Sequence, residues 1–591
     1  MQTIDGLKLY NYIISGAENL IFNEHDLNEI NVFPVADGDT GTNLALTMRN
    51  IISQAQQSDK ADLTLDSISR IALANAYGNS GLIFAQYLYG LAIEAKNKEQ
   101  LTVEEFVNIS KRATDYAYEA VASPKEGTIL TAMREWGNEL EVNLQHDFEG
   151  IIDKSISKIA DVVNQTKNKL KVLKDNNVVD AGAKAFLYFI EGINQFIKTG
   201  KLSFRRTKSL TDQGNHENNI KGEVVYRNKY CTQFSIISDK ETSYFKNILA
   251  EYGDSLVVTK ADDNVQIHLH TDTPDKVMKE LVNEKNIISQ KIDNIKFQSS
   301  VINNRKYRIG VITDSIADFD SEFIENEQIC VVPLNIICDS ISYFDKLTMT
   351  SEFFYQELDH FKMHPTSSQP TKQFIEQKLY FMLQHYDSVI AITVSKNMSG
   401  TYNNFIAAAE KLAYLDKKID VIDSKVNSAA QGLLVRETIK YLKTGMPHEE
   451  IVQKINALKE KTRIYVSVKT LKYMLKGGRV SKVKGAILSR IKLKPVVSID
   501  EKGHGSIFKP TLTQNGAVKQ ILRKIEKDAR SEGILRYSIV YSDSKDQIDS
   551  FMKQLIKITG KQPEFIVPIS PIVGLNAGKG SFAVAYIKGV E

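Results

Sequence analysis

Two aspartates in a glycine-rich turn are the residues of this sequence best suited to hold a metal ion. Asp37 and Asp39 lie within residues 31–43, which read Asn-Val-Phe-Pro-Val-Ala-Asp-Gly-Asp-Thr-Gly-Thr-Asn and lead into a predicted helix. Mg²⁺ prefers carboxylate oxygens together with substrate phosphates, and the start of a helix offers unpaired N–H groups to a phosphate. The alternative is a plain turn in which Thr42 or Asn43 caps the helix.

Three further segments place small or polar residues directly before an apolar helix. They read Gly-Asn-Ser-Gly at 78–81, Pro-Lys-Glu-Gly-Thr at 124–128 and Val-Asp-Ala-Gly at 179–182. Helix capping alone explains any one of them. Because helix N-termini receive anions, the four segments together predict a helical domain that holds a nucleotide at one end.

A cysteine and two histidines form a second candidate metal site. His268 and His270 alternate with Ile267 and Leu269, so both imidazoles face the same side if this segment is a strand. Cys231 can add a soft ligand for Zn²⁺. The alternative is a pair of solvent-facing histidines and an inert buried thiol.

Hydroxyl-bearing segments follow the predicted strands of the C-terminal region. Asp314, Ser399 and Asp423 come just after such strands, at the carboxyl ends where open α/β sheets bind ligands. Hydroxyls and a cation gathered there suit a carboxylate or a phosphate. Ser424 is not expected to be a nucleophile, because no nucleophile elbow surrounds it and no histidine is placed to serve it.

Apolar periodicity divides the chain into regions that position these groups. Residues 1–200 show helical spacing, which predicts an all-α domain, and the polar residues 201–221 predict a linker. Short alternating runs over 222–305 predict a small α+β domain. Apolar strands alternate with helices over 306–591, which predicts an α/β domain with a mostly parallel sheet. The eight helical segments are expected at 5–22, 43–56, 65–76, 80–95, 103–121, 127–138, 150–166 and 181–198.

Length and composition bound the class of protein. With 591 residues the chain is too long for a single core. Its 75 Lys and Arg balance 72 Asp and Glu, for a net charge of +3, so nucleic acid is not an expected partner. Three cysteines, and apolar runs too short to span a bilayer, predict a cytoplasmic protein with no transmembrane segment.

The motifs of the helical region together resemble the nucleotide-binding domain (DAK2) of the dihydroxyacetone kinase family, and more closely its fatty acid kinase branch. The resemblance implies an eight-helix barrel that binds ATP and Mg²⁺. It continues through the middle domain, where it includes Cys231, His268 and His270 and so favours a Zn²⁺ site. The residues it assigns to the Mg²⁺ and nucleotide site are Asp37, Asp39, Thr42, Asn43, Gly78, Asn79, Ser80, Gly81, Thr128, Asp180 and Gly182.

Two departures from the family pattern leave details of this site open. The sugar-kinase branch has a further aspartate where this chain reads Asn31-Val32, so Asn31 or water is expected to take its place and the number of Mg²⁺ ions stays open. The glycine-rich continuation of the Asp-Ala-Gly segment is replaced from Ala183 onward, which leaves the nucleotide preference open.

The C-terminal region closely resembles the DegV family of fatty-acid-binding proteins over nearly all of residues 306–591. The resemblance implies two lobes with an acyl chain buried between them, and Ser368 in contact with its carboxylate. Asn576 stands where the family commonly has a histidine, so it can donate a hydrogen bond but carries no charge. The residues assigned to the fatty acid site are Ser315, Thr366, Ser367, Ser368, Ser399, Gly400, Thr401, Arg479 and Asn576.

A kinase-like domain and a fatty-acid-binding domain in one chain predict a single-chain fatty acid kinase that converts ATP and a long-chain fatty acid to acyl phosphate and ADP. One alternative is a dihydroxyacetone-type kinase of small polyols with a regulatory lipid-binding domain. The other is a non-catalytic lipid carrier or sensor. Transient membrane contact for lipid exchange and a homodimer both stay open.

Overall fold

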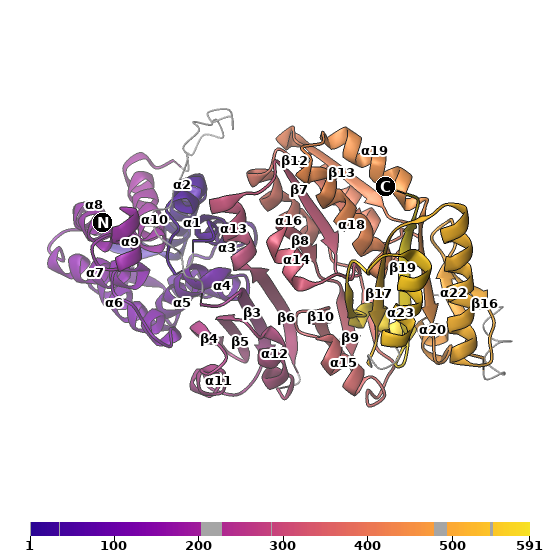
Figure 1. Cartoon of the computed structure of the whole chain (residues 1–591). Helices are drawn as coiled ribbons and strands as arrows, with labels where there is room; N and C mark the ends of the chain where they lie inside the picture. Colours follow the sequence, from indigo (N-terminus) through magenta and orange to yellow (C-terminus); the bar gives the residue numbers. More distant parts are fainter. Residues whose placement is uncertain are drawn as a thin grey trace. The chain divides into compact units, whose positions relative to one another are not determined.

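The computed structural model divides the chain into two compact units, Met1–Asn303 and Asn304–Glu591 (Figure 1). It describes residues 2–34, 36–201, 227–284, 286–477, 493–543 and 548–590. The predicted linker lies outside the described residues apart from Lys201, and so does Arg479.

The first unit begins with a helical domain, as predicted. Each of the eight predicted helical segments has its counterpart in a long helix, and two short helices are added between them. A two-stranded antiparallel sheet pairs β1, which precedes α1, with β2, which lies between α5 and α6. The elements are β1 (Thr3–Asp5), α1 (Gly6–Phe22), α2 (Glu24–Glu29), α3 (Thr40–Gln54), α4 (Ala61–Ala74), α5 (Gly78–Glu94), β2 (Gln100–Thr102), α6 (Val103–Ala120), α7 (Ile129–Val142), α8 (Phe148–Thr166), α9 (Lys171–Asn176) and α10 (Ala181–Thr199).

Local sequence explains where several of these helices begin. Thr102 caps α6 in a capping box with Glu105, in which each side chain bonds the other residue's backbone N–H. Asp180 caps α10 by accepting from the Ala183 N–H at 2.7 Å. The helices bury a shared apolar core, in which the Phe84 ring lies 5.0 Å from that of Phe189.

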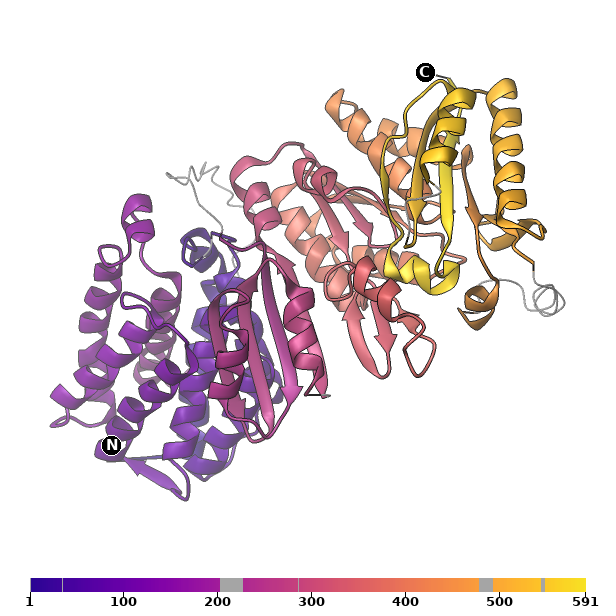
Figure 2. The same cartoon turned by 60° about the horizontal axis from the view of Figure 1, so that its bottom comes forward.

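A four-stranded antiparallel sheet completes the first unit, in the order β4-β5-β3-β6. One face of this sheet packs on the helices, as Figure 2 shows. Val257 belongs to the helical core, and the Gln233 amide donates to the Ala76 carbonyl oxygen at 2.6 Å. The elements are β3 (Tyr230–Ile237), α11 (Thr242–Leu249), β4 (Asp254–Ala261), β5 (Asn264–Thr271), α12 (Pro274–Val282), β6 (Ile287–Asn294) and α13 (Ile295–Asn304).

The second unit has two lobes, and its first lobe has the predicted parallel sheet, in the order β13-β12-β7-β8. A small antiparallel sheet of β10, β9 and β11 accompanies it. The elements are β7 (Ile309–Asp314), α14 (Ser321–Asn326), β8 (Ile329–Val332), β9 (Asn335–Cys338), β10 (Ile341–Phe344), α15 (Ser351–Glu357), β11 (Thr366–Ser368), α16 (Lys372–His385), β12 (Ser388–Thr393), α17 (Thr401–Lys411), the 3₁₀ turn η1 (Ala413–Leu415), β13 (Lys418–Asp423), α18 (Ser428–Lys443) and α19 (His448–Lys459).

The sheet of the second lobe, in the order β16-β15-β14-β19-β17-β18, corrects the prediction of a mostly parallel sheet. Only β17 and β18 pair in parallel, and the other neighbours are antiparallel. The tight connection from β15 to β16 is a hairpin, which needs no crossover helix. The elements are β14 (Thr462–Ser467), α20 (Lys472–Gly477), β15 (Val496–Ile499), β16 (Gly505–Lys509), α22 (Gln514–Ser531), β17 (Ile534–Tyr541), α23 (Ile548–Thr559), β18 (Ile566–Pro568), α24 (Pro571–Ala577) and β19 (Phe582–Lys588).

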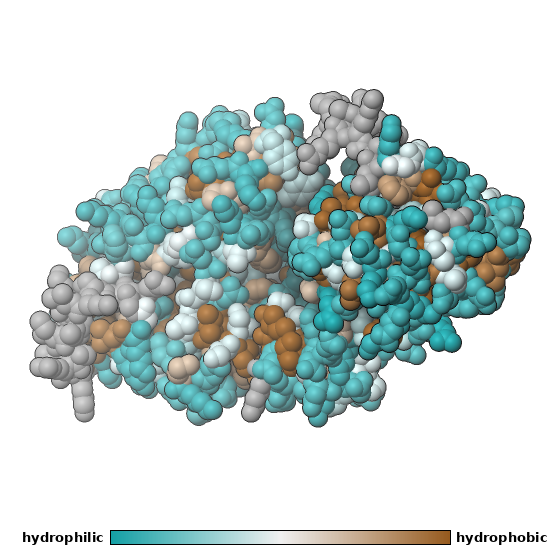
Figure 3. Space-filling model, turned by 180° about the vertical axis from the view of Figure 1, so that it is seen from behind, coloured by the Kyte–Doolittle hydropathy of each residue, from teal (hydrophilic) through white to brown (hydrophobic). Residues whose placement is uncertain are grey.

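The surface shown in Figure 3 is mainly hydrophilic, with hydrophobic residues in separate groups. Large exposed apolar side chains include Val142 and Leu512, which lie far apart in sequence. Single exposures of this kind are normal for globular proteins. None of the helices in the described part of the chain combines the length and the apolar character needed to cross a bilayer.

Candidate functional site

The acidic turn is held in place by Asn31. The Asn31 side chain donates to Asp37 Oδ1 at 2.7 Å, and its own oxygen accepts from the Thr40 hydroxyl. All three residues are buried. Both ends of the Asn31 amide are therefore engaged by its neighbours, and Asn31 positions Asp37. A role for Asn31 as a metal ligand stays a prediction.

Keeping Asp37 and Asp39 ionised beside each other is electrostatically unfavourable, and a bound cation would reduce this cost. Burial raises the pKa of Asp37 well above its usual value, and the neighbouring charge of Asp39 adds to the effect. Burial also raises the pKa of Asp39, against the opposing charge of Lys291. Two close carboxylates removed from water favour either a proton or a cation between them. The residues present thus fit Mg²⁺, whose preferred ligands are oxygens.

The starts of four helices, α3, α5, α7 and α10, meet near this turn. A Cβ atom added at Gly78, where φ is +67°, would lie 2.7 Å from Asn43 Nδ2. One added at Gly182 would lie 3.0 Å from Ser80 Oγ and 3.2 Å from Ile129 Cβ. Glycine is needed at both positions because of these close approaches. The segments 31–43, 78–81, 124–128 and 179–182, singled out separately, are thus brought together.

The remaining predicted nucleotide-binding residues differ in whether their side chains already have hydrogen-bond partners. The Thr42 hydroxyl accepts from Asn28 Nδ2 at 2.9 Å, and the Thr128 hydroxyl donates to the Lys125 carbonyl oxygen at 2.8 Å. Burial raises the pKa of Asp180 to about 7. Asn79 Oδ1 is buried and has no hydrogen-bond partner among the described residues. An orphaned acceptor of this kind fits a bound group that donates a hydrogen bond to it.

Cys231, His268 and His270 converge on one face of the middle sheet, as predicted from their alternation. Cys231 on β3 is directly opposite His270 on β5, and Gln233 is opposite His268. Cys231 Sγ lies 3.9 Å from His268 Nε2, and one ligand atom from each of the three residues lies within 4.8 Å of the others. His270 Nδ1 lies 3.6 Å from Asp254 Oδ1, which can orient the ring.

The protonation of this cluster suits a metal in part. Burial lowers the pKa of His268 well below the usual histidine value and that of His270 to about 4, so both imidazoles stay neutral at pH 7. Burial raises the pKa of the Cys231 thiol. A bound cation would reverse that preference and deprotonate the thiol.

Two charged residues that the sequence reasoning missed connect the cluster to the acidic turn. Asp293 on β6 is directly opposite Cys231, and Lys291 is opposite Gln233. Their spacing of two places both on the same sheet face as the Cys-His cluster. Charged residues alternating with buried Ile292 were the signal in the sequence, but the strand pairing that brings them to Cys231 was not readable from it.

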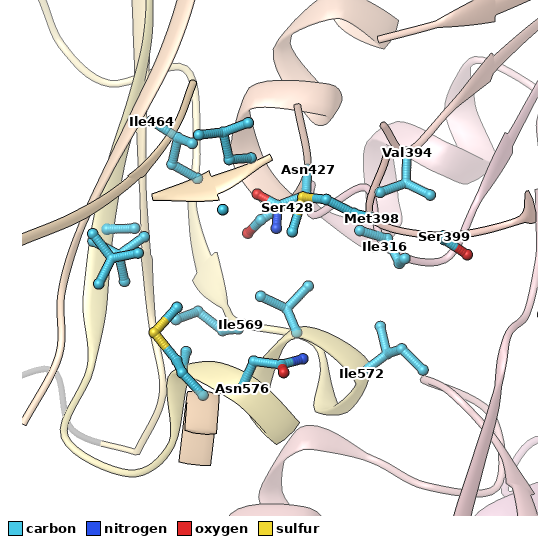
Figure 4. A pocket seen from close by; sticks show the side chains of 18 of the residues that line it. Ile316, Val394, Met398, Ser399, Asn427, Ser428, Ile464, Ile569, Ile572 and Asn576 are labelled. Carbon is cyan, nitrogen blue, oxygen red and sulfur yellow. The ribbon is translucent and has the colours of Figure 1, made fainter. Parts of the chain in front are cut away.

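The second unit has a largely apolar cavity between its lobes, and the empty space within it and at its opening to solvent is about 910 Å³. Figure 4 shows side chains from separate segments pointing into it, among them Met398, Ile464 and Ile572. The polar side chains in the wall are few. They are Ser367, Ser399, Asn427, Ser428, Ser498 and Asn576.

Of the predicted fatty acid residues on β11 and just before α17, only some face the cavity. Ser367 faces the cavity, whereas Thr366 and Ser368 are exposed, because side chains alternate along a strand. The contact of Ser368 with a carboxylate stays a prediction. Ser399 lines the cavity and lies 2.8 Å from the hydroxyl of the buried Thr401.

Three more predicted residues have different surroundings. The Ser315 hydroxyl is fully buried and accepts from the N–H of the lining residue Leu334 at 3.1 Å, but Ser315 itself does not line the cavity. Gly400 packs so closely on Gln369 that an added Cβ atom would lie 2.0 Å from its Oε1. Asn576 lines the cavity, and its Oδ1 is buried without a hydrogen-bond partner in the described part of the chain. The unmet polar group of the cavity is therefore an uncharged amide.

Three parts of the chain match known protein families. Residues 34–195 match the DAK2 domain, and residues 227–302 match a middle domain of the fatty acid kinase (FakA-like) type. Residues 308–589 match the DegV family, described as uncharacterised. These matches confirm the resemblances inferred from the motifs.

Individual relatives cover different parts of the chain. Protein YloV of Bacillus subtilis is 29% identical over 317 residues, 51% of this chain and 57% of the relative, so the chain spans little more than half of that protein's length. A DegV domain-containing protein of Clostridium acetobutylicum is 30% identical over 283 residues, 48% of this chain and 99% of the relative. A solved stearic-acid-binding protein from Eubacterium ventriosum is 26% identical, with a TM-score of 0.44, and covers 48% of this chain and 98% of that one.

The fold and the matches together define a modular protein in which a DAK2-type helical domain and a small middle domain precede a two-lobed α/β domain. Through that last domain, the chain belongs to the DegV family.

Proposed function

We propose that this protein is a fatty acid kinase that transfers the terminal phosphate of ATP to the carboxylate of a long-chain fatty acid. The observation that carries the proposal is the pair of buried Asp37 and half-buried Asp39 at the meeting point of four helix starts, in one chain with an apolar cavity. The match of residues 227–302 to a fatty acid kinase middle domain supports the choice of substrate.

Asp37 and Asp39 would hold Mg²⁺, which neutralises charge on the phosphates when bound. The backbone N–H groups at the starts of α3 and α5 would receive the phosphates. Asn31 keeps Asp37 in position through its 2.7 Å hydrogen bond. The protein supplies position and charge, which is most of what phosphoryl transfer requires.

The reaction balances without a general base. An oxygen of the ionised carboxylate forms a bond to the terminal phosphorus, and the bond from that phosphorus to the bridging oxygen of ADP breaks. The products are an acyl phosphate and ADP. The nucleophile is already charged at neutral pH, so no proton has to leave it.

The test is to incubate the full chain with ATP, Mg²⁺ and oleate or palmitate, and to trap acyl phosphate with hydroxylamine. We expect a fatty hydroxamate and one ADP for each. Phosphorylation of dihydroxyacetone or glycerol instead would show a polyol kinase, and fatty acid binding without ADP formation would show a carrier. Either result would contradict the proposal.

We also propose that Cys231, His268 and His270 bind Zn²⁺. Three protein ligands with a fourth position open are the arrangement found in catalytic zinc sites. The three ligand atoms already lie within 4.8 Å of one another, and two of the ligands lie on adjacent strands in fixed register. Little rearrangement is needed to bind the metal.

The zinc proposal predicts about one equivalent of metal per chain in protein purified without chelators, measured by elemental analysis. Cys231→Ser and His268→Asn should each reduce it to below about a tenth of an equivalent, while Cys338→Ser, which changes a buried thiol of the second unit, should not. Because burial holds both imidazoles neutral, the metal should be retained below pH 6.5, where ordinary histidines become protonated. A wild-type protein free of transition metals would count against the site.

A further inference from the structure

Lys291 is placed where the middle sheet meets the helical domain. It lies on β6, on the sheet face that carries Gln233, Cys231 and Asp293. Its side chain is 26% exposed, so it is largely enclosed but accessible to a ligand. The DAK2 match ends at residue 195, so this lysine comes from outside the kinase-type domain.

The ammonium group of Lys291 reaches the starts of two helices of that domain. Nζ lies 3.5 Å from Asn43 Oδ1, in the first turn of α3. It also lies 5.2 Å from the ring centroid of Tyr77, the residue that precedes α5. On its own strand it pairs with Asp293 Oδ2 at 3.1 Å. The cation therefore lies beside both of the helix starts that would receive phosphates.

A cation is unfavourable at the positive end of a helix dipole unless anions surround it. Burial alone would lower the pKa of Lys291, but the carboxylates of Asp293 and Asp39 outweigh it, and the pKa is raised. Lys291 is therefore charged at neutral pH. Near it lie the carboxylates of Asp39 and Asp293, and Asp37 neighbours Asp39; a divalent ion would largely neutralise this group of carboxylates. With that ion bound, the three carboxylates, the dication and the ammonium sum to a net charge of about zero, so a phosphate is no longer repelled and can contact the ammonium directly.

We propose that Lys291 is a further catalytic residue, whose ammonium contacts the terminal phosphate of the nucleotide. This inference rests on the proposed function. Lys291 would stabilise the charge on the phosphoryl group as its bond to ADP breaks and its bond to the fatty acid oxygen forms. The middle sheet then completes the active site, and the helical domain alone lacks one of the charges that transfer requires.

The test compares Lys291→Met, Lys291→Arg and the control Lys260→Met. Lys260 lies on the same sheet but on the opposite face, where its Nζ pairs with Glu241 at 3.2 Å. Turnover is measured with Mg²⁺, ATP and oleate, and affinities for ATP and ADP are measured by calorimetry. Lys291→Met should lower kcat by about 100-fold or more, the effect of losing one such donor. The variant should also bind ATP about tenfold more weakly relative to ADP, because only ATP has the phosphate that Lys291 contacts. Lys291→Arg should keep the preference for ATP, and Lys260→Met should match the wild type.

An unchanged ATP-to-ADP ratio in Lys291→Met, with a wild-type unfolding temperature, would overturn the inference and leave a structural ion pair. If Lys291→Met does not fold, Lys291→Arg decides: loss of the ATP preference in a folded arginine variant contradicts a role for the charge. If the wild type prefers ATP but phosphorylates no fatty acid, the proposed function fails, and the affinity ratio still tests Lys291 separately.

Discussion

Replacing Asp37 or Asp39 by alanine is expected to abolish ATP-dependent phosphorylation and, at the same time, to make the metal-free protein more stable. Mg²⁺ bound at this turn would supply several kcal/mol of charge stabilisation, so its loss should cost about 10³-fold in turnover. The gain in stability follows from the cost of keeping one buried and one half-buried carboxylate charged side by side, which disappears when one is removed.

The stability of the metal-free wild type should fall as the pH rises. The pKa values of Asp37 and Asp39 are raised on folding, so the folded protein holds their protons to a higher pH than the unfolded chain does. Their contribution to stability is complete below the ordinary carboxyl pKa near 4 and is lost as the pH rises through the raised values. Thermal unfolding in chelator across pH 4 to 8 should show this loss in the wild type and a smaller one in each variant.

The control is Asp66→Ala, which removes an exposed carboxylate paired with Arg70 on α4. It should leave turnover unchanged and shift the unfolding temperature little. Full turnover in both Asp37→Ala and Asp39→Ala, with an unaltered Mg²⁺ requirement, would contradict the assignment of the metal site.

A fragment of residues 304–591 is expected to fold by itself and to retain a fatty acid from the cells that express it. It is one compact unit, and a DegV domain-containing relative of 99% matched length consists of this domain alone. The cavity between its lobes is lined by groups of the same unit. Organic extraction and mass spectrometry of the purified fragment should therefore find an acyl chain.

Filling the cavity should remove that ligand. Val466 on β14 lines it and is half-buried, so Val466→Trp should reduce the extracted fatty acid by about tenfold without unfolding the fragment. Val590→Trp, at a position 79% exposed, is the matched control and should leave it unchanged. A folded wild-type fragment that yields no lipid would contradict the proposed fatty acid binding.

The sequence predicted the parts of this structure that depend on local pattern. Helical periodicity located the eight long helices, and strand alternation placed His268 and His270 on one face. Parallel pairing in the second lobe was predicted wrongly, because alternation of strands and helices does not reveal that β14, β15 and β19 pair as antiparallel neighbours.

In the candidate site, too, only the residues that are close in sequence could be predicted. The residues of the acidic turn are close in sequence and could be recognised from it. Lys291 and Asp293 could not, because their place beside Asn43 and Cys231 depends on β6 pairing with β3 and on the sheet packing against the helices. Ser367 faces the cavity and Ser368 does not because of the register of β11, which the hydroxyl-rich motif alone leaves undefined.

The pairing of Asp293 with Cys231 across two strands gives the two proposed metal sites a shared neighbour. The negative charge of Asp293 raises the pKa of Asp39 on one side and the pKa of Cys231 on the other. A dication at either position would be stabilised by the same negative charge of Asp293. Binding of one ion should therefore weaken binding of the other, by the same factor in both directions. If both ions bind as proposed, the Mg²⁺ concentration that half-saturates this protein should change with the amount of zinc that the preparation has kept.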